Sequence, residues 1–267
     1  LNVNKFRIII KYNLPEVENA LLILAKDNEL VEKIINDLFL RNRYHFEKKG
    51  RRTMTDMYFD YKDKSLKKHK IDLRIRSTEG EAPKITLKVL KRITSSHSER
   101  VEIELIWSRE SFDEIMKELS SHLEGHVLES SANFINEDPE NILTSVKFVK
   151  IQERKTERNI INATNSRTSE LEFEFAIDRT FYRLNSSYED YGLMELEIES
   201  KKTGNYEILD RLVDEIINDH QSKFYIWPHS KLATGLAIET LLSRRELKAG
   251  EDFDNDGLLT LSGAKKI

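Results

Sequence analysis

Charged and apolar residues alternate strictly along several short segments of this chain, and this alternation is the feature that most constrains its fold. In residues 71–90, charged side chains alternate with aliphatic ones on both sides of a turn that contains Gly80 and Pro83. Successive side chains of a β-strand point to opposite faces of a sheet. The segment is therefore predicted to be two strands with one apolar and one charged face. The same pattern recurs in residues 98–107, 169–178 and 193–200.

Other segments complete the predicted set of elements. Apolar residues recur at helical spacing in four of them, residues 16–42, 109–123, 205–219 and 230–247. Three more are predicted as strands, residues 5–14, 55–61 and 146–161. No internal repeat or linker divides the chain, so we expect one α+β domain over residues 1–247 and an acidic tail over residues 248–267.

The charged face of the sheet has two interpretations. Three strands carry acidic residues at successive positions of one face, and another carries Arg74 and Arg76. Like charges that are adjacent on one face repel unless counter-charges or cations lie between them. An antiparallel sheet closed into a barrel would bring acidic and basic strands face to face around a wet interior suited to a polyanion and divalent cations. The alternative is an open sheet whose charged face is simply solvated, and the pattern alone leaves both open.

Composition excludes some classes of function. The chain has 43 basic and 47 acidic residues, so its net charge of −4 gives no argument for a nucleic-acid or membrane partner. Because it has no cysteine, disulfides and thiolate metal sites are excluded. No apolar segment approaches membrane-spanning length. We expect a cytoplasmic protein, monomeric or homodimeric, with a small-molecule partner.

Short motifs follow one another along the chain in a distinctive order. They are YFD (58–60), LRIR (73–76), TLK (86–88), RVEIE (100–104), AID (176–178), ELEIE (195–199) and SKLATGL (230–236). This order resembles the CYTH, or triphosphate tunnel metalloenzyme, superfamily, which includes inorganic, thiamine and RNA triphosphatases, class IV adenylate cyclases and polyphosphate polymerase domains. The resemblance implies an eight-stranded antiparallel closed β-barrel, flanked by helices, that binds a triphosphate lengthwise in its tunnel.

The resemblance also implies roles for individual residues. Basic side chains would bind the phosphates, namely Lys11, Arg74, Arg76, Lys88, Arg100, Arg154, Arg158 and Lys231. Four of these, Lys11, Arg74, Arg76 and Lys88, are the expected catalytic residues. Acidic side chains would hold Mg²⁺ or Mn²⁺, namely Glu102, Glu104, Asp178, Glu195 and Glu197. The implied reaction is phosphoryl transfer to water, in which the metal neutralises charge and activates water.

The first strand departs from the family pattern, which is Glu-x-Glu-x-Lys. The matching stretch, residues 7–11, keeps Lys11 but has Arg7 and Ile9 at the glutamate positions. Neither of these side chains can ligate a hard divalent cation, which prefers oxygen donors. The sequence Glu-Val-Glu at 16–18 comes soon after, but Ala20 replaces the lysine and we interpret this stretch as the start of a helix.

Three functional hypotheses therefore stay open. The first is a metal-dependent hydrolase of inorganic tripolyphosphate or of an organic triphosphate. The second is a polyphosphate- or nucleotide-binding module without efficient turnover. The third is a polyphosphate-polymerase-like relative. The last is favoured by Arg7, Lys11 and Tyr12, which match that branch's Arg-x-Glu-x-Lys-Tyr pattern. We expect the hydrolase, because the acidic strands have no obvious purpose without a metal.

The tail contains a further candidate site. Its sequence DFDNDG (252–257) is similar to the start of a calcium loop, with Asp252, Asp254 and Asp256 as ligands. The acid at the twelfth position is missing, because Gly263 stands there. An unstructured acidic tail is the favoured interpretation, and a Ca²⁺ site is the alternative.

Overall fold

The structure is a computed structural model that describes residues 17–24, 27–38, 43–93, 98–123, 138–184, 190–202 and 206–267. For residues 17–18, 91–93, 98–100 and 206 only the backbone is described. The predicted first strand, residues 5–14, lies outside this part of the chain, and so do Arg7, Ile9 and Lys11.

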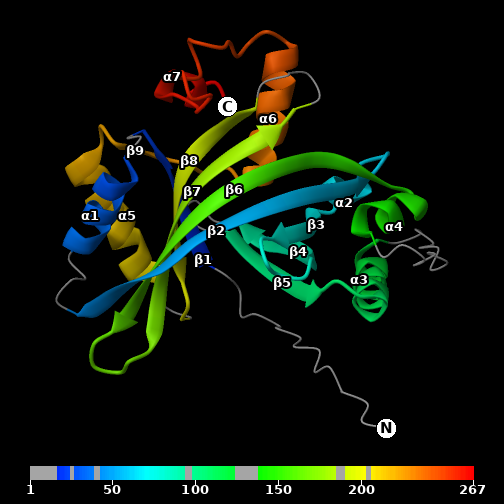
Figure 1. Cartoon of the computed structure of the whole chain (residues 1–267), viewed down its shortest axis with the longest axis horizontal. Helices are drawn as coiled ribbons and strands as arrows, with labels where there is room; N and C mark the ends of the chain where they lie inside the picture. Colours follow the sequence, from blue (N-terminus) through cyan, green and yellow to red (C-terminus); the bar gives the residue numbers. More distant parts are fainter. Residues whose placement is uncertain are drawn as a thin grey trace.

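One antiparallel sheet organises the described residues (Figure 1). Its strands, in chain order, are β1 (Val17–Ile23), β2 (Tyr44–Tyr61), β3 (Ile71–Thr78), β4 (Lys84–Ile93), β5 (Ser98–Ile106), β6 (Phe148–Asn165), β7 (Leu171–Arg183), β8 (Tyr191–Ser200) and β9 (Phe224–Ile226). Their order across the sheet is β5-β4-β3-β2-β6-β7-β8-β1-β9. The seven helices of the described residues are α1 (Asn28–Asp37), α2 (Ser65–Lys68), α3 (Arg109–His122), α4 (Pro139–Ser145), α5 (Tyr206–His220), α6 (Lys231–Ser243) and α7 (Leu261–Ala264).

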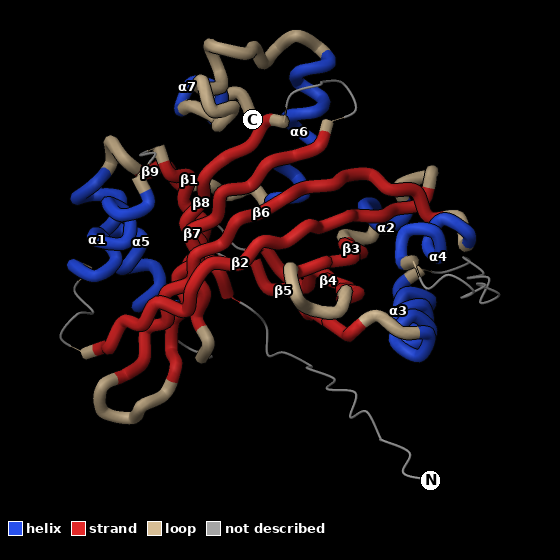
Figure 2. The backbone as a smooth tube through the Cα atoms, in the orientation of Figure 1, coloured by secondary structure: helices blue, strands red, loops and turns tan. Residues whose placement is uncertain are grey.

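The prediction of a closed eight-stranded barrel is not confirmed. In the described part of the chain the sheet has nine strands and is not closed by hydrogen bonds, because its end strands β5 and β9 do not pair. The short strand β9 pairs with the outer edge of β1 at Leu21–Ile23 and occupies that edge. The sheet nevertheless curves, and residues of β1 and β5 approach one another. The tube in Figure 2 shows the long strands β2, β6, β7 and β8 side by side and strongly twisted.

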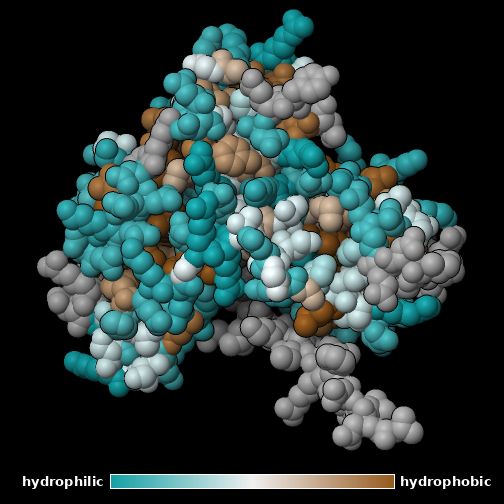
Figure 3. Space-filling view, in the orientation of Figure 1, coloured by the Kyte–Doolittle hydropathy of each residue, from teal (hydrophilic) through white to brown (hydrophobic). Residues whose placement is uncertain are grey.

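The apolar outer face of the sheet is covered at two places by helices. The outward side chains of β7, β8 and β1 pack against α1 and α5. Those of β2 to β5 pack against α3 and α4. On the side of the molecule shown in Figure 3, hydrophilic residues predominate and apolar ones are scattered. The outer face of these strands is therefore apolar and covered by helices, whereas the inner face is mixed, because Leu22, Tyr182 and Leu193 form an apolar cluster with α6.

The predicted helix over residues 16–42 is wrong in its first part. Residues 17–23 form strand β1, and the helix begins only at Asn28, after Asp27 caps it by accepting bonds from the N–H groups of Glu29 (2.9 Å) and Leu30 (3.2 Å). Leu21 and Leu22, which point to opposite faces of the strand, are both fully buried. An uninterrupted apolar run fits a buried strand as well as a helix, so periodicity alone could not distinguish the two.

The last twenty residues are ordered, which corrects the expectation of an unstructured tail. Phe253, Leu258 and Leu259 are buried in an apolar cluster with α6 and the start of β8. The backbone at Gly192 of β8 bonds to this segment twice, donating to the carbonyl of Gly257 (2.9 Å) and accepting from the N–H of Leu259 (2.8 Å). The acidic composition of the segment gave no indication of this packing. The unpaired backbone at Gly192 binds the segment, and its apolar side chains then pack beside β8.

Helix α6 is seated by close contacts with the sheet. A Cβ atom added at Gly235 would lie 2.4 Å from Nε2 of Gln152 and 2.4 Å from Cδ1 of Tyr182. We expect Gly235→Ala to lower the free energy of unfolding by about 1–3 kcal/mol, because the overpacked core must shift. Urea denaturation would measure the loss. Thr240→Ala, at an exposed position of the same helix, is the control, and an equal loss in both variants would contradict the seating contact.

Candidate functional site

The charged inner face of the sheet forms two walls that face each other. The pKa of Glu197 on β8 is lowered, against the effect of burial, by Lys231 and Arg158. Lys88 of β4 also contributes, although β4 is near the other end of the strand order. Arg74, Asp178 and Glu195 of this face are all buried, and residues of β1 and β5 approach one another across the curve of the sheet. The charged face thus lines an interior, which removes the interpretation of a flat, solvated face.

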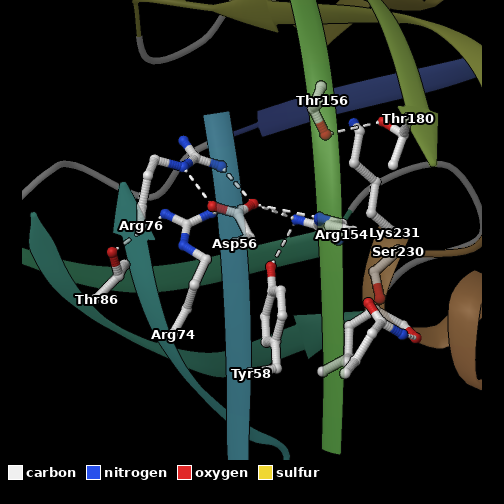
Figure 4. A network of polar contacts seen from close by, with 12 residues as sticks. Asp56, Tyr58, Arg74, Arg76, Thr86, Arg154, Thr156, Thr180, Ser230 and Lys231 are labelled. Carbon is white, nitrogen blue, oxygen red and sulfur yellow. Dashed lines mark hydrogen bonds and ion pairs between the residues drawn. The ribbon is translucent and has the colours of Figure 1, made fainter. Parts of the chain in front are cut away.

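On the first wall, one aspartate holds three arginines (Figure 4). Asp56 of β2 accepts two bonds from Arg76, at 2.7 and 2.9 Å. It accepts two more from Arg154 of β6, at 3.2 and 2.9 Å. A nitrogen of Arg74 lies 3.8 Å from the same carboxylate. We call Arg74, Arg76 and Arg154 the arginine cluster.

The arginine cluster carries more positive charge than its immediate partner neutralises. Asp56 is 1% exposed, and although burial would raise its pKa, Arg74, Arg76 and Arg154 hold it well below the usual value. Nε of Arg74 and Nη1 of Arg154 are buried and have no hydrogen-bond partner among the described residues. Buried donors without a partner are uncommon in folded proteins. The cluster therefore has buried N–H groups that are available to an anion.

The predicted acids of β5 belong to the same wall. Glu102 lies 2.6 Å from the ammonium of Lys88, and Glu104 lies 3.0 Å from that of Lys84. Arg74 reaches both glutamates at 3.4 Å and also donates to the hydroxyl of Thr86 at 3.1 Å. Glu102 and Glu104 thus hold Arg74 of β3 and two lysines of β4 in place by ion pairs.

On the opposite wall, three carboxylates converge on one ammonium group. Nζ of Lys231, the first residue of α6, lies 3.1 Å from Asp178, 3.1 Å from Glu195 and in contact with Glu197. We call these three acids the carboxylate centre. Arg158 of β6 donates to Asp178 at 2.7 Å and also contacts Glu197.

The electrostatics of the carboxylate centre reflect a shortage of positive charge. Burial, together with repulsion from Glu197 and Asp178, raises the pKa of Glu195 to about 7. Its Oε2 atom approaches Lys231 without the geometry of a hydrogen bond and has no other partner among the described residues. One carboxylate of the three is therefore incompletely satisfied.

The structure brings together most of the residues predicted from the sequence, and the side chains of two others are not described. Lys11 lies outside the described residues, and for Arg100 only the backbone is described, paired with Leu90. The register of residues 146–161, which the sequence did not determine, places both Arg154 and Arg158 among the inner charges.

Sequence reasoning missed several inner residues. Asp56 and Tyr58 lie on β2, and Tyr58 accepts a bond from Arg154 at 2.7 Å. Their alternate spacing in residues 55–61 was a usable signal, since it continues the inward pattern of the neighbouring strands. Tyr182 continues the same face as Asp178, and its fully buried hydroxyl has no partner in the described part of the chain.

The carboxylate centre has the donor chemistry of a divalent-cation site. Carboxylate oxygens are the ligands preferred by Mg²⁺ and Mn²⁺. As the side chains stand, however, no three acidic or histidine residues of the described ranges are arranged to hold a metal, because an ammonium group lies between the three carboxylates. The residues fit the chemistry of such an ion, and Lys231 is the cation that they now hold.

The acids of the C-terminal segment are engaged with the chain itself. Asp252 is buried and lies 2.6 Å from the ammonium of Lys266. Asp254 accepts bonds from the N–H groups of Asp256 (2.8 Å) and Leu258 (3.1 Å). The Ca²⁺ alternative stays a prediction. Within the described ranges, no helix has the length and apolar character needed to cross a membrane.

Comparison with known proteins gives one family and several similar structures. A family model described as CYTH domain matches residues 27–227. Among curated proteins none matches. A candidate adenylyl cyclase from Hippeastrum, described with a dominant triphosphatase activity, is 15% identical over 88% of this chain and 99% of that chain, with a TM-score of 0.47. The PH1819 protein from Pyrococcus horikoshii is 17% identical over 85% and 99%, with a TM-score of 0.46. A candidate adenylate cyclase from Bacillus halodurans is 18% identical over 81% and 94%, with a TM-score of 0.43.

Proposed function

This chain belongs to the CYTH domain family, and from that premise we propose that it binds a triphosphate inside its curved sheet and hydrolyses it. The substrate is inorganic tripolyphosphate or an organic or nucleoside triphosphate. The reaction is transfer of a phosphoryl group to water.

The arginine cluster is the observation that carries this proposal. Three guanidinium groups surround one carboxylate, and two of them keep a buried N–H group without a partner in the described residues. Guanidinium forks match phosphate oxygens in shape and charge, and they are more weakly hydrated than ammonium groups. A buried surplus of such groups is suited to a polyanion and has no comparable use in a neutral structural core.

The chain's own residues have distinct roles in this proposal. Asp56 orients the forks of Arg76 and Arg154 before substrate arrives, so little reorganisation is needed at binding. Two further basic residues would contact phosphates: Lys88, beside Glu102, and Arg158, beside Asp178. Lys231 would contact phosphate from the helix side. The proposed roles of Lys11 and Arg100 rest on the family resemblance.

A divalent cation, Mg²⁺ or Mn²⁺, is part of the same proposal. The carboxylate centre would hold it, with Glu102 and Glu104 on the opposite wall as further oxygen donors. When bound, such an ion supplies charge neutralisation at the phosphates and lowers the pKa of a bound water.

The described strand β1 changes how the family's first-strand pattern is placed. Ala20 is in register with Glu197 and Glu18 with Glu199, and the two edges of β8 are taken by β1 and β7. We propose that residues 16–20, Glu-Val-Glu-Asn-Ala, and not residues 7–11, correspond to Glu-x-Glu-x-Lys. In this placement the glutamates are retained, and the missing member is the lysine, replaced by Ala20.

Phosphate release is the test of this function. We expect the protein to release phosphate from tripolyphosphate, ATP or thiamine triphosphate in the presence of Mg²⁺ or Mn²⁺. Malachite green would measure the released phosphate, and addition of EDTA should stop the release. Glu197→Gln should abolish release, because it removes a carboxylate and an ion-pair partner of Lys231 and Arg158. Release no greater than that of Glu197→Gln with every substrate would contradict hydrolysis. Protection of the protein from thermal unfolding by tripolyphosphate, without release, would instead support the binding module.

A further inference from the structure

Lys231 places a buried cation at the point where three carboxylates meet. Its side chain is 8% exposed, and its ammonium group contacts Asp178, Glu195 and Glu197 at once. Arg158 bridges two of these acids, Asp178 and Glu197, and Lys231 is the cation that contacts all three. Three oxygen donors around one positive charge are the arrangement that a metal ion would otherwise require.

The surroundings of Glu197 leave room for the lysine. Residues directly opposite each other in an antiparallel pair share one face. Ala20 on β1 and Ala176 on β7 are the residues opposite Glu197, and both have the smallest side chain that a non-glycine residue can offer. Glu197 is therefore flanked by short side chains on both neighbouring strands.

The start of α6 holds Lys231 in this place. Ser230 caps the helix by accepting a bond from the N–H of Ala233 at 3.2 Å. One turn further on, Gly235 lies against Tyr182 and Gln152, and the amide of Gln152 donates to the carbonyl of Leu232 at 3.0 Å. The contacts that fix the start of α6 against the sheet therefore also fix the position of the Lys231 ammonium group.

Charge balance shows what the carboxylate centre lacks. When all three acids are ionised, their three charges face two cations, Lys231 and Arg158, and one negative charge is left over. Oε2 of the buried Glu195 has no hydrogen-bond partner among the described residues. A divalent ion in place of the ammonium would balance the three carboxylates together with Arg158.

We infer that Lys231 is a tethered cation that occupies the divalent-ion position of the carboxylate centre and competes with Mg²⁺ or Mn²⁺ for it. The inference concerns the site of the proposed function but does not require turnover. It implies that metal affinity in this chain is set by how easily Lys231 leaves the three carboxylates.

Mn²⁺ binding to the substrate-free protein tests this inference. Titration of wild type and Lys231→Met, followed by calorimetry and by the Mn²⁺ electron paramagnetic resonance signal, compares their affinities. We expect Lys231→Met to bind Mn²⁺ at least about tenfold more tightly, because two uncompensated negative charges then face the ion. Lys231→Arg keeps the positive charge and should bind as weakly as wild type. Lys202→Met is the matched control, since it removes a surface lysine that also bridges two glutamates, Glu170 and Glu172.

Two further measurements keep the test decisive. Adding Glu195→Gln to Lys231→Met removes one of the two uncompensated charges and should reverse most of the gain in Mn²⁺ affinity. Mn²⁺ should also raise the melting temperature of Lys231→Met and leave that of wild type unchanged. Equal Mn²⁺ affinity in wild type and Lys231→Met would overturn the inference, and so would a Lys231→Met protein that stays unfolded in Mn²⁺. Because no triphosphate is present, these outcomes are independent of whether the protein hydrolyses one.

Discussion

Replacing Asp56 by asparagine is expected to lower the free energy of unfolding by about 3–5 kcal/mol, because it leaves buried charges without their partner. Asp56 is the shared acceptor of Arg76 and Arg154 and lies near Arg74. Asparagine keeps the shape of the side chain but cannot balance three guanidinium groups. Urea denaturation at neutral pH would measure the loss, with Asp113→Asn, on the exposed side of α3, as the control.

The same residue predicts a dependence on acid. The arginines hold the pKa of Asp56 well below its usual value, so the folded protein binds this proton less readily than the unfolded chain. Stability from this group is therefore present above about pH 4 and is lost as the pH falls toward the depressed pKa. Asp56→Asn should flatten this part of the stability curve relative to wild type. A variant as stable as wild type, or equally sensitive to acid, would show that Asp56 does not brace the arginines.

Replacing Arg74 by alanine is expected to weaken triphosphate binding or turnover by about 100-fold or more, as removal of a preorganised charged donor does in other sites. Arg74 is buried, connects Asp56 with Glu102 and Glu104, and keeps an unpartnered Nε within the described structure. Binding of tripolyphosphate by calorimetry, and phosphate release where it occurs, would measure the effect.

Two companion variants separate phosphate recognition from general loss of charge. Arg183→Ala removes an arginine of β7 that is 75% exposed and pairs with Glu153, so it should bind triphosphate as wild type does. Arg74→Lys keeps the charge but loses the planar fork, and an intermediate loss is expected. If Arg74→Ala folds and retains the affinity of wild type, the arginine cluster is not the phosphate site. A loss shared equally by Arg183→Ala would point to bulk electrostatics.

Much of the site was predictable from local pattern. Alternation identified β3, β4, β5, β7 and β8 because a strand's period of two assigns each side chain to a face, whatever the strand's neighbours are. It placed Arg74, Arg76, Lys88, Glu195 and Glu197 on the charged face, and the order of motifs identified the family that the match over residues 27–227 confirms. These inferences needed only the order of residues along the chain.

Other features could not be predicted in this way. The apolar run in residues 20–25 suits either a helix or a strand, and the free edge of β8 decides for β1. Acidic composition suggested a tail without structure, whereas Phe253 and Leu259 pack against α6 and β8. Closure of the barrel depends on which strands meet at the end of the sheet, and in the described residues β9 takes the edge of β1.

The sequence by itself determined which side chains of each strand are charged and which are apolar, because that follows from the period of the backbone. It also determined that like charges are adjacent on one face of several strands, so that counter-charges must come from elsewhere in the molecule. Only the tertiary structure decided which charges become partners. Asp56 meets three arginines from two other strands, and Lys231, far along the chain, meets three carboxylates of β7 and β8. The physical reason is that Coulomb interactions depend on distance in space, and the curvature of the sheet and the seat of α6 set those distances.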